Sequence, residues 1–195
     1  MFVRIGAAFA ALVLAAAIAF VWLAGSRNDE RTAIAGIGGP FALVDQHGRH
    51  VTERNYLGKP MLVFFGFTHC PDVCPTTLLE LTNLIKELGP DAGRLNVLFI
   101  TVDPERDTPQ QLSLYLSSFD PRITGLSGSP AAVAAVMKEY RAIARKVPLT
   151  DGGYTMDHTA TIYMMNAAGQ LAGMMSYQDT QAAMRAKLKR LLDSS

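Results

Sequence analysis

Two cysteines carry most of the chemistry that this sequence offers. Cys70 and Cys74 are the only cysteines in the chain, and they lie in the stretch HCPDVCP with three residues between them. A thioredoxin redox pair has two residues between its cysteines, so this separation is wider. Two nearby thiols can close into a disulfide, or they can bind a metal ion as thiolates. The motif alone is therefore compatible with a redox pair, with part of a metal site, or with both.

One histidine is a candidate third ligand. His158, in YTMDHTATIYMM, lies on a predicted loop before a strand. In a thioredoxin-type fold this loop packs beside the cysteine loop, so its pairing with Cys70 and Cys74 rests on analogy of fold. Without the cysteines, an ordinary polar loop residue is the simpler interpretation. Two thiolates and one imidazole suit Cu(I) and can also hold Cu(II), whereas a structural zinc site usually has four protein ligands.

Other polar side chains are weaker candidates. Neighbouring side chains at the end of an extended strand point in opposite directions, so we expect the histidine next to Cys70 to support the site rather than to bind metal. Met156 offers a thioether two residues from His158, while the other methionines in predicted strands are expected to pack in the core. The candidates for a supporting role are His69, Asp72, Asp103 and Asp157.

The stretch TVDPERDTP, residues 101–109, follows a predicted strand and lies at the same end of the sheet as the cysteine loop. Asp103, Arg106 and Asp107 in this stretch are compatible with two interpretations. They form an internal ion pair, or they dock a partner.

Hydrophobic patterning places these residues on an α/β fold. Continuous apolar runs predict buried strands at residues 61–67 and 95–102, with an amphipathic helix over residues 76–88 between them. Hairpins are predicted at residues 41–51 and 160–177, and a final helix at residues 180–192. Thr108 and Ser129 each precede a proline and predict the starts of two further helices. The order is strands, helix, strand, two helices, hairpin and helix, which predicts a thioredoxin-like mixed sheet flanked by helices.

The sequence Cys74-Pro75 has the same form as these two helix starts. It predicts that Cys74 is the N-cap residue of the first helix, where unpaired N–H groups favour a thiolate. The alternative is a cap at Thr76 or Thr77, with Glu80 completing a capping box from Thr77.

The amino-terminal segment predicts a membrane anchor. Residues 5–24 contain no charged side chain and are long enough for a transmembrane helix. We therefore expect an anchor at residues 1–25, a tether at 26–37 and one thioredoxin-like copper-binding domain at 38–195. A cleavable signal peptide is the alternative, with Ala24-Gly25-Ser26 as the cleavage site. Both interpretations export the domain, and a formal net charge of +1 gives no electrostatic basis for nucleic-acid binding.

Several stretches together resemble the SCO/SenC family of membrane-anchored copper proteins. The resemblance covers residues 37–177 and is carried by GGPFALVDQHG, GKPMLVFFGFTHCPDVCPTTL, FITVDPERDTPQQL, GLSGS and YTMDHTATIYMMNAAGQL. It implies that Cys70, Cys74 and His158 bind one copper ion. It also implies a thioredoxin-like domain on the periplasmic side of the inner membrane that assists assembly of the binuclear copper centre in subunit II of cytochrome c oxidase.

Two functional hypotheses remain open at this level. In the first, the protein is a copper-binding assembly factor rather than an enzyme, and it exchanges metal with subunit II or with other copper chaperones. In the second, it is a thiol–disulfide oxidoreductase that reduces the cysteines of its partner and is itself served by a thiol reductant. A peroxidase is less well supported, because the sequence specifies no activating environment for a peroxidatic cysteine.

Overall fold

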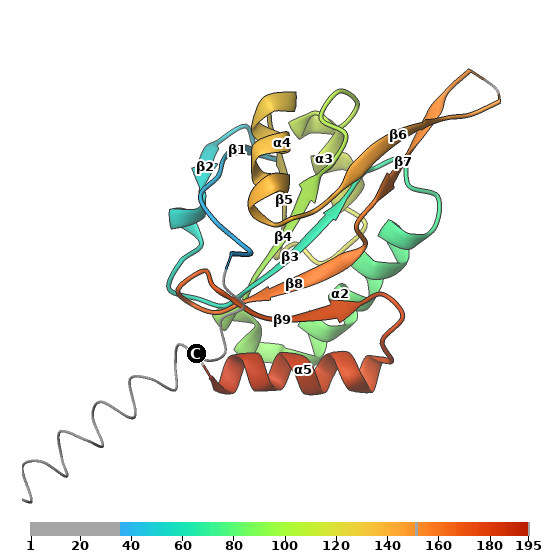
Figure 1. Ribbon diagram of the computed structural model, residues 1–195. Helices are drawn as coiled ribbons and strands as arrows, with labels where there is room; N and C mark the ends of the chain where they lie inside the picture. Colours follow the sequence, from blue (N-terminus) through green and yellow to red (C-terminus); the bar gives the residue numbers. More distant parts are fainter. Residues whose placement is uncertain (1–35, 151, 195) are drawn as a thin grey trace, which may run out of the picture. The chain divides into compact units, whose positions relative to one another are not determined.

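A mixed sheet of seven strands forms the centre of the computed structural model, which describes residues 36–150 and 152–194 (Figure 1). The strand order is β2-β1-β5-β4-β3-β8-β9. β3, β4 and β5 are parallel to one another, whereas every other pairing is antiparallel. The strands of this sheet are β1 (Ala42–Asp45), β2 (His50–Thr52), β3 (Met61–Gly66), β4 (Asn96–Thr101), β5 (Ile123–Ser127), β8 (Thr161–Met165) and β9 (Leu171–Ser176).

Helices cover both faces of this sheet. They are α2 (Val73–Leu88), α3 (Pro109–Leu116), α4 (Pro130–Glu139) and α5 (Gln181–Asp193), with short 3-10 helices at Glu53–Asn55 and Gly89–Arg94. On one face, Phe64 contacts Phe99, which contacts Tyr115 of α3. On the other face, Phe65 packs against Tyr140 at the end of α4. Residues of β3 are buried on both faces, which explains its continuous apolar sequence.

A second, two-stranded sheet lies outside this arrangement. β6 (Ala144–Pro148) and β7 (Tyr154–His158) pair in antiparallel register, with Ala144 opposite His158. Most of their side chains are exposed or only half-buried. Figure 1 shows this β6–β7 hairpin extending away from the main sheet.

Most of the predicted elements are confirmed. Both hairpins, the two buried parallel strands and the final helix are present, and Thr108 and Ser129 cap α3 and α4 through their side chains. The predicted element order was incomplete, because it omitted β5 and the β6–β7 hairpin.

The predicted start of the first helix was wrong. α2 begins at Val73 with Asp72 in the cap position, so Cys74 lies inside the first turn. The alternative capping box is also wrong, because the hydroxyl of Thr77 donates to the carbonyl oxygen of Val73. Pro75 is tolerated here because the backbone N–H groups of a first helical turn have no intrahelical acceptor.

The predicted anchor and most of the predicted tether lie outside the described residues. Within residues 36–150 and 152–194, no helix has the length and apolar character needed to cross a membrane.

Candidate metal centre

The cysteine loop begins where β3 ends, at Gly66. Asp107 fixes the start of this loop: its carboxylate accepts hydrogen bonds from the backbone N–H of Thr68 at 2.9 Å and from the Thr68 hydroxyl at 2.7 Å. The hydroxyl of Thr101 donates to the same carboxylate at 2.7 Å. Asp107 is fully buried, so these donors compensate for the loss of its hydration. The loop is thereby attached to the ends of β3 and β4.

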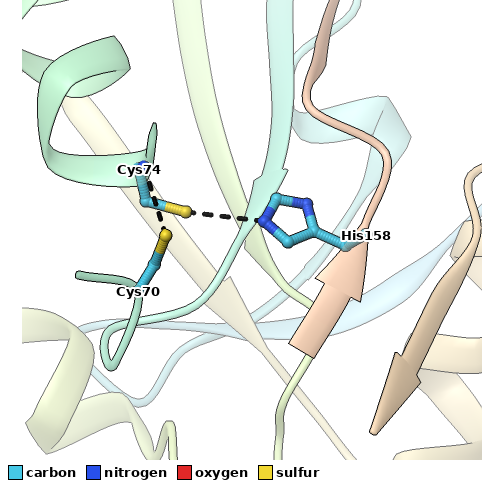
Figure 2. Close-up of side chains that lie close together, drawn as sticks. All are labelled: Cys70, Cys74 and His158. Carbon is cyan, nitrogen blue, oxygen red and sulfur yellow. Dashed lines mark hydrogen bonds between the residues drawn. The ribbon is translucent and has the colours of Figure 1, made fainter. Parts of the chain in front are cut away.

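The two sulfur atoms meet at the amino-terminal end of α2. The backbone N–H of Cys74 donates to Sγ of Cys70 at 3.4 Å (Figure 2). Cys74 is fully buried, whereas Cys70 is half-buried. The sulfur that accepts from the helix N-terminus therefore belongs to Cys70, not to Cys74 as the sequence predicted.

His158 reaches the cysteines from the β6–β7 hairpin. β8 pairs antiparallel with β3, so the segment that enters β8 lies at the edge of the sheet where β3 ends. Nε2 of His158 is 3.7 Å from Sγ of Cys74 (Figure 2). Nδ1 is 3.0 Å from the carbonyl oxygen of Thr159. A carbonyl oxygen only accepts, so Nδ1 donates its proton to Thr159 and Nε2 is the ring nitrogen that faces the sulfur. The imidazole also packs edge-on against Phe67, with ring centroids 5.6 Å apart.

The two thiols differ in acidity. A hydrogen bond from the Cys74 thiol is the main cause that lowers the pKa of Cys70 to about 3, and His158 and the backbone N–H groups of Cys74 and Asp72 lower it further. The pKa of Cys74 is raised, chiefly because its proton is held by Cys70 and because the thiol is buried. The metal-free pair therefore consists of a thiolate at Cys70 and a thiol at Cys74.

The three side chains form a compact donor set. Sγ of Cys70, Sγ of Cys74 and a ring nitrogen of His158 all lie within 4.8 Å of one another. Two sulfur ligands on one ion lie at most about 4.6 Å apart, given metal–sulfur bonds of about 2.3 Å. A small movement of the side chains is thus enough for all three to bind one ion. A cavity of about 250 Å³ opens beside Cys70 and His158 and gives access to the site.

Two thiolates and an imidazole form a donor set that suits copper. Within residues 36–150 and 152–194, this is the one group of three or more histidine, cysteine or carboxylate side chains close enough to hold an ion.

Comparisons with known proteins agree with this geometry. The sequence profile described as SCO1/SenC matches residues 29–193. The chain belongs to the SCO1/SenC family. The mitochondrial SCO1 homolog 1 of Arabidopsis thaliana is 44% identical over 133 residues, which is 68% of this chain and 40% of that protein. The chain spans about half the length of the curated relatives it matches.

Solved structures extend the family comparison to the fold. The structure of Bradyrhizobium japonicum ScoI with copper bound is 53% identical in sequence and has a TM-score of 0.75. The match covers 80% of this chain and 99% of ScoI. BsSco, described as a member of the Sco family of cytochrome c oxidase assembly proteins with a disulfide switch, is 22% identical with a TM-score of 0.66; 84% of this chain and 97% of BsSco are covered. The mixed α/β, thioredoxin-like fold is therefore the fold of the SCO1/SenC family.

The four supporting candidates in this SCO1/SenC chain occupy different surroundings. His69 is turned toward Thr68 and Asp107, with Nδ1 3.8 Å from a carboxylate oxygen of Asp107. Asp72 occupies the cap position of α2, and its backbone N–H contributes to lowering the pKa of Cys70. Asp157 forms an exposed pair with Arg145. The backbone of Asp72 is thus the one part of these three residues that acts directly on a cysteine.

Asp103, the fourth candidate, is buried and paired with Arg106. The ion pair, one of the two interpretations of this stretch, is therefore present between Asp103 and Arg106. The hydroxyl of Tyr154 donates to Asp103 at 2.9 Å, so this pair connects to the strand that carries His158.

Sequence patterning missed Tyr154 and placed His158 on a loop rather than at the end of β7. Tyr154, Met156 and His158 alternate along this strand, so they share one face of it. The alternation of Tyr154, Met156 and His158 was the available signal, but it covers only five residues and ends in a histidine. Met156 lines the cavity beside Cys70 and His158.

Proposed function

We propose that this protein binds one copper ion through Cys70, Cys74 and His158. We further propose that it uses this ion to support metallation of the binuclear copper centre in cytochrome c oxidase subunit II. The observation that carries the proposal is the convergence of two sulfur atoms and one ring nitrogen of a histidine within 4.8 Å. Three protein ligands leave the ion accessible, which suits a metal that must enter and be passed on. Copper bound to ScoI of Bradyrhizobium japonicum supports the choice of metal.

The proposed place of action follows from the amino-terminal sequence. Residues 1–25 anchor the chain in the inner membrane, residues 26–37 form the tether, and residues 38–195 form the copper-binding domain on the periplasmic side. The apolar segment at residues 5–24 supports this arrangement. Copper-accepting proteins with exposed cysteines in that compartment are the expected partners.

A copper titration of the reduced full chain tests the ligand set. We expect one Cu(I) ion per chain, measured by competition with a chromophoric Cu(I) chelator. Substitution His158→Ala should weaken binding at least a hundredfold, because it removes one of three donors. His69→Ala is the matched control, since His69 faces Asp107, and its affinity should equal that of the unmodified chain. Unchanged affinity in the His158→Ala chain would contradict the three-ligand site.

A second candidate function is thiol–disulfide exchange with the partner. The lowered pKa and partial exposure of Cys70 favour it, because the attacking species in exchange is an accessible thiolate. Cys70 attacks the partner disulfide and Cys74 resolves the mixed disulfide, so a Cys70–Cys74 disulfide forms and the partner disulfide breaks. Two electrons and the proton of Cys74 pass to the partner, and its second thiolate takes a proton from solvent. Cys70→Ser should abolish this reduction, while His158→Ala should retain most of it. The opposite response to His158→Ala separates this function from copper binding.

The two functions are mutually exclusive at a given moment. Closure of a Cys70–Cys74 disulfide removes both thiolates, so the oxidised chain should release copper. Copper retention measured across a series of redox buffers should fall as the disulfide forms. An affinity independent of the buffer potential would argue against this coupling.

A further inference from the structure

The strand that carries His158 is only partly anchored in the hydrophobic core, through the half-buried side chain of Met156. β7 pairs only with β6, and neither strand joins the main sheet. None of the residues in these two strands is fully buried. Segments with few buried apolar contacts open locally at low free-energy cost. Some other contact must therefore hold His158 close to the cysteines.

The loop after β4 supplies such a contact through Arg106. One terminal nitrogen of the guanidinium, Nη1, donates to the carbonyl oxygen of Tyr154 at 3.0 Å. The guanidinium carbon lies 3.8 Å from the centroid of the Tyr154 ring, within the range of a cation–π interaction. Arg106 thus binds both the backbone and the side chain of the first residue of β7.

The buried side chain of Asp103 binds both Arg106 and Tyr154. Its side chain is 1% exposed. One carboxylate oxygen accepts from Nε of Arg106 and the other accepts from the Tyr154 hydroxyl at 2.9 Å. A buried carboxylate with both oxygens occupied in this way holds its partners in one geometry. Asp103, Arg106 and Tyr154 form a three-residue cluster, which we call the clamp.

The clamp also touches the surroundings of the imidazole. The guanidinium of Arg106 lies 5.9 Å from the ring centroid of Phe67, and Phe67 packs edge-on against His158. Tyr154 and His158 share one face of β7, four residues apart. The clamp therefore acts on His158 by two routes, along the strand and through the Phe67 ring.

We propose that Arg106 is a positioning residue, which holds β7 against the loop after β4 and so keeps the His158 imidazole within reach of Cys70 and Cys74. The residue contacts none of the three donor atoms. Its loss lets β7 open, and the metal-free chain then spends part of its time without the third ligand. Apparent copper affinity falls in proportion to the fraction that remains competent to bind. This inference rests on the proposed copper site.

The chain offers a matched control for the loss of a buried ion pair. Asp120 is 5% exposed, and Arg122 donates to its two carboxylate oxygens at 2.8 and 2.7 Å. This pair precedes β5, at the end of the parallel strands opposite to the cysteine loop. Arg106→Met and Arg122→Met each leave a buried aspartate without its arginine, but only Arg106→Met releases β7.

The test compares these two variants of the reduced full chain in three measurements. They are Cu(I) affinity by chelator competition, global stability by denaturant unfolding, and amide hydrogen exchange of residues 154–158 in the metal-free state. We expect both variants to lower global stability, but only Arg106→Met to lower copper affinity, by at least tenfold. Its β7 amides should exchange at least tenfold faster, while those of Arg122→Met keep the rates of the unmodified chain.

Two further variants make the test independent of folding failure. Arg106→Lys keeps a charge beside Asp103 and Tyr154 but loses the fixed fork of the guanidinium, so it should recover part of the lost affinity. Tyr154→Leu removes the ring and the hydroxyl while Arg106 remains, and it should reproduce the faster exchange of β7. If Arg106→Met does not fold, these two variants decide the question by the same measurements.

Three results would overturn the inference. One is unchanged affinity and exchange in Arg106→Met, another is an equal loss of affinity in Arg106→Met and Arg122→Met, and the third is unchanged β7 exchange in Tyr154→Leu. Failure of the unmodified chain to bind copper would instead overturn the proposed function. Hydrogen exchange in the metal-free chain then still decides whether the clamp holds β7.

Discussion

The two cysteines and the histidine come from regions of very different construction. The cysteine loop is fixed by a buried carboxylate, a fully buried strand and the first turn of α2. His158 ends a strand whose side chains are exposed or half-buried and whose only partner strand is β6. The cysteine half of the site is part of the core, while the histidine half is held by a few polar contacts and by the half-buried side chains of Met156 and His158.

This difference predicts which substitutions lower the stability of the fold and which affect metal binding alone. Substitutions in the cysteine half, meaning the cysteine loop and the contacts that fix it, should lower the free energy of unfolding, because the same contacts hold the core together. Damage to the histidine half should affect the site while most of the fold remains intact. The following predictions test that separation.

The largest expected effect concerns the pH dependence of thiol reactivity. Because the pKa of Cys70 is lowered to about 3, its thiolate persists as the pH falls well below neutrality. The alkylation rate of Cys70 by iodoacetamide should be nearly constant from pH 8 to pH 5. An ordinary thiol loses about a thousandfold of its thiolate over the same range. Mass spectrometry of the alkylated peptide gives the rate at each pH.

Two variants show which half of the site produces this acidity. The hydrogen bond from Cys74 is the main cause of the lowered pKa, and the contribution of His158 is smaller. Cys74→Ala should therefore shift the pH profile of Cys70 upward by more than His158→Ala does. A larger shift in His158→Ala would show that the histidine half controls the thiolate.

The second prediction concerns the buried carboxylate of the cysteine half. Asp107→Ala leaves two donors of Thr68 and the hydroxyl of Thr101 without their acceptor. Loss of one acceptor costs about 1–3 kcal/mol for each buried donor left unsatisfied, so we expect a loss of about 3 kcal/mol in the free energy of unfolding. Urea denaturation measures it. Asp157→Ala removes an exposed carboxylate of the histidine half and should change stability by at most about 0.5 kcal/mol.

Comparable losses in these two variants would contradict the separation between the two halves. It would mean that the exposed Arg145–Asp157 pair holds the fold as firmly as the buried Asp107 does.

The third and smallest prediction concerns space beside the Cys74 sulfur. A Cβ atom on Gly66 would lie 2.8 Å from Sγ of Cys74 and 2.5 Å from the Phe99 ring. Gly66→Ala should cost about 1–3 kcal/mol through overpacking, and the displaced sulfur should weaken copper binding. Gly173→Ala in β9 is the control, because its nearest neighbour would be the Met164 sulfur at 3.7 Å, an ordinary contact. Equal effects of the two substitutions would show that the close neighbours of Gly66 are not the cause of the loss.

Hydrophobic patterning predicted the strands that consist almost entirely of apolar residues. β3 and β4 are continuous apolar runs, so they were predictable. β5 was missed because it is short and contains Gly125, where a Cβ atom would lie 2.5 Å from the Leu116 side chain. The close packing of α3 against β5 explains why position 125 is a glycine, but this packing cannot be recognised from the sequence pattern. The β6–β7 hairpin was missed because its strands are short and at most half-buried, so their few apolar residues form no extended pattern.

The composition of the site was predictable to a similar extent. The two cysteines are unique in the chain, and His158 was paired with them by analogy of fold. The division of protons between Cys70 and Cys74 was not predictable, because it depends on how the two thiols lie relative to each other, to His158 and to the first turn of α2. The contacts of Arg106 with Tyr154 join residues 48 positions apart, and only the folded chain brings them together.

The hydrogen bond from the backbone N–H of Cys74 to Sγ of Cys70 has a consequence for the proton stoichiometry of metal loading. Since Cys70 is already a thiolate, Cys74 is the one cysteine that must lose a proton. The two cysteines together thus release a single proton when one ion binds near neutral pH. A calorimetric titration repeated in buffers of different ionisation enthalpy measures the number of protons released on binding. The affinity for the metal then depends on pH through the ionisation of the Cys74 thiol.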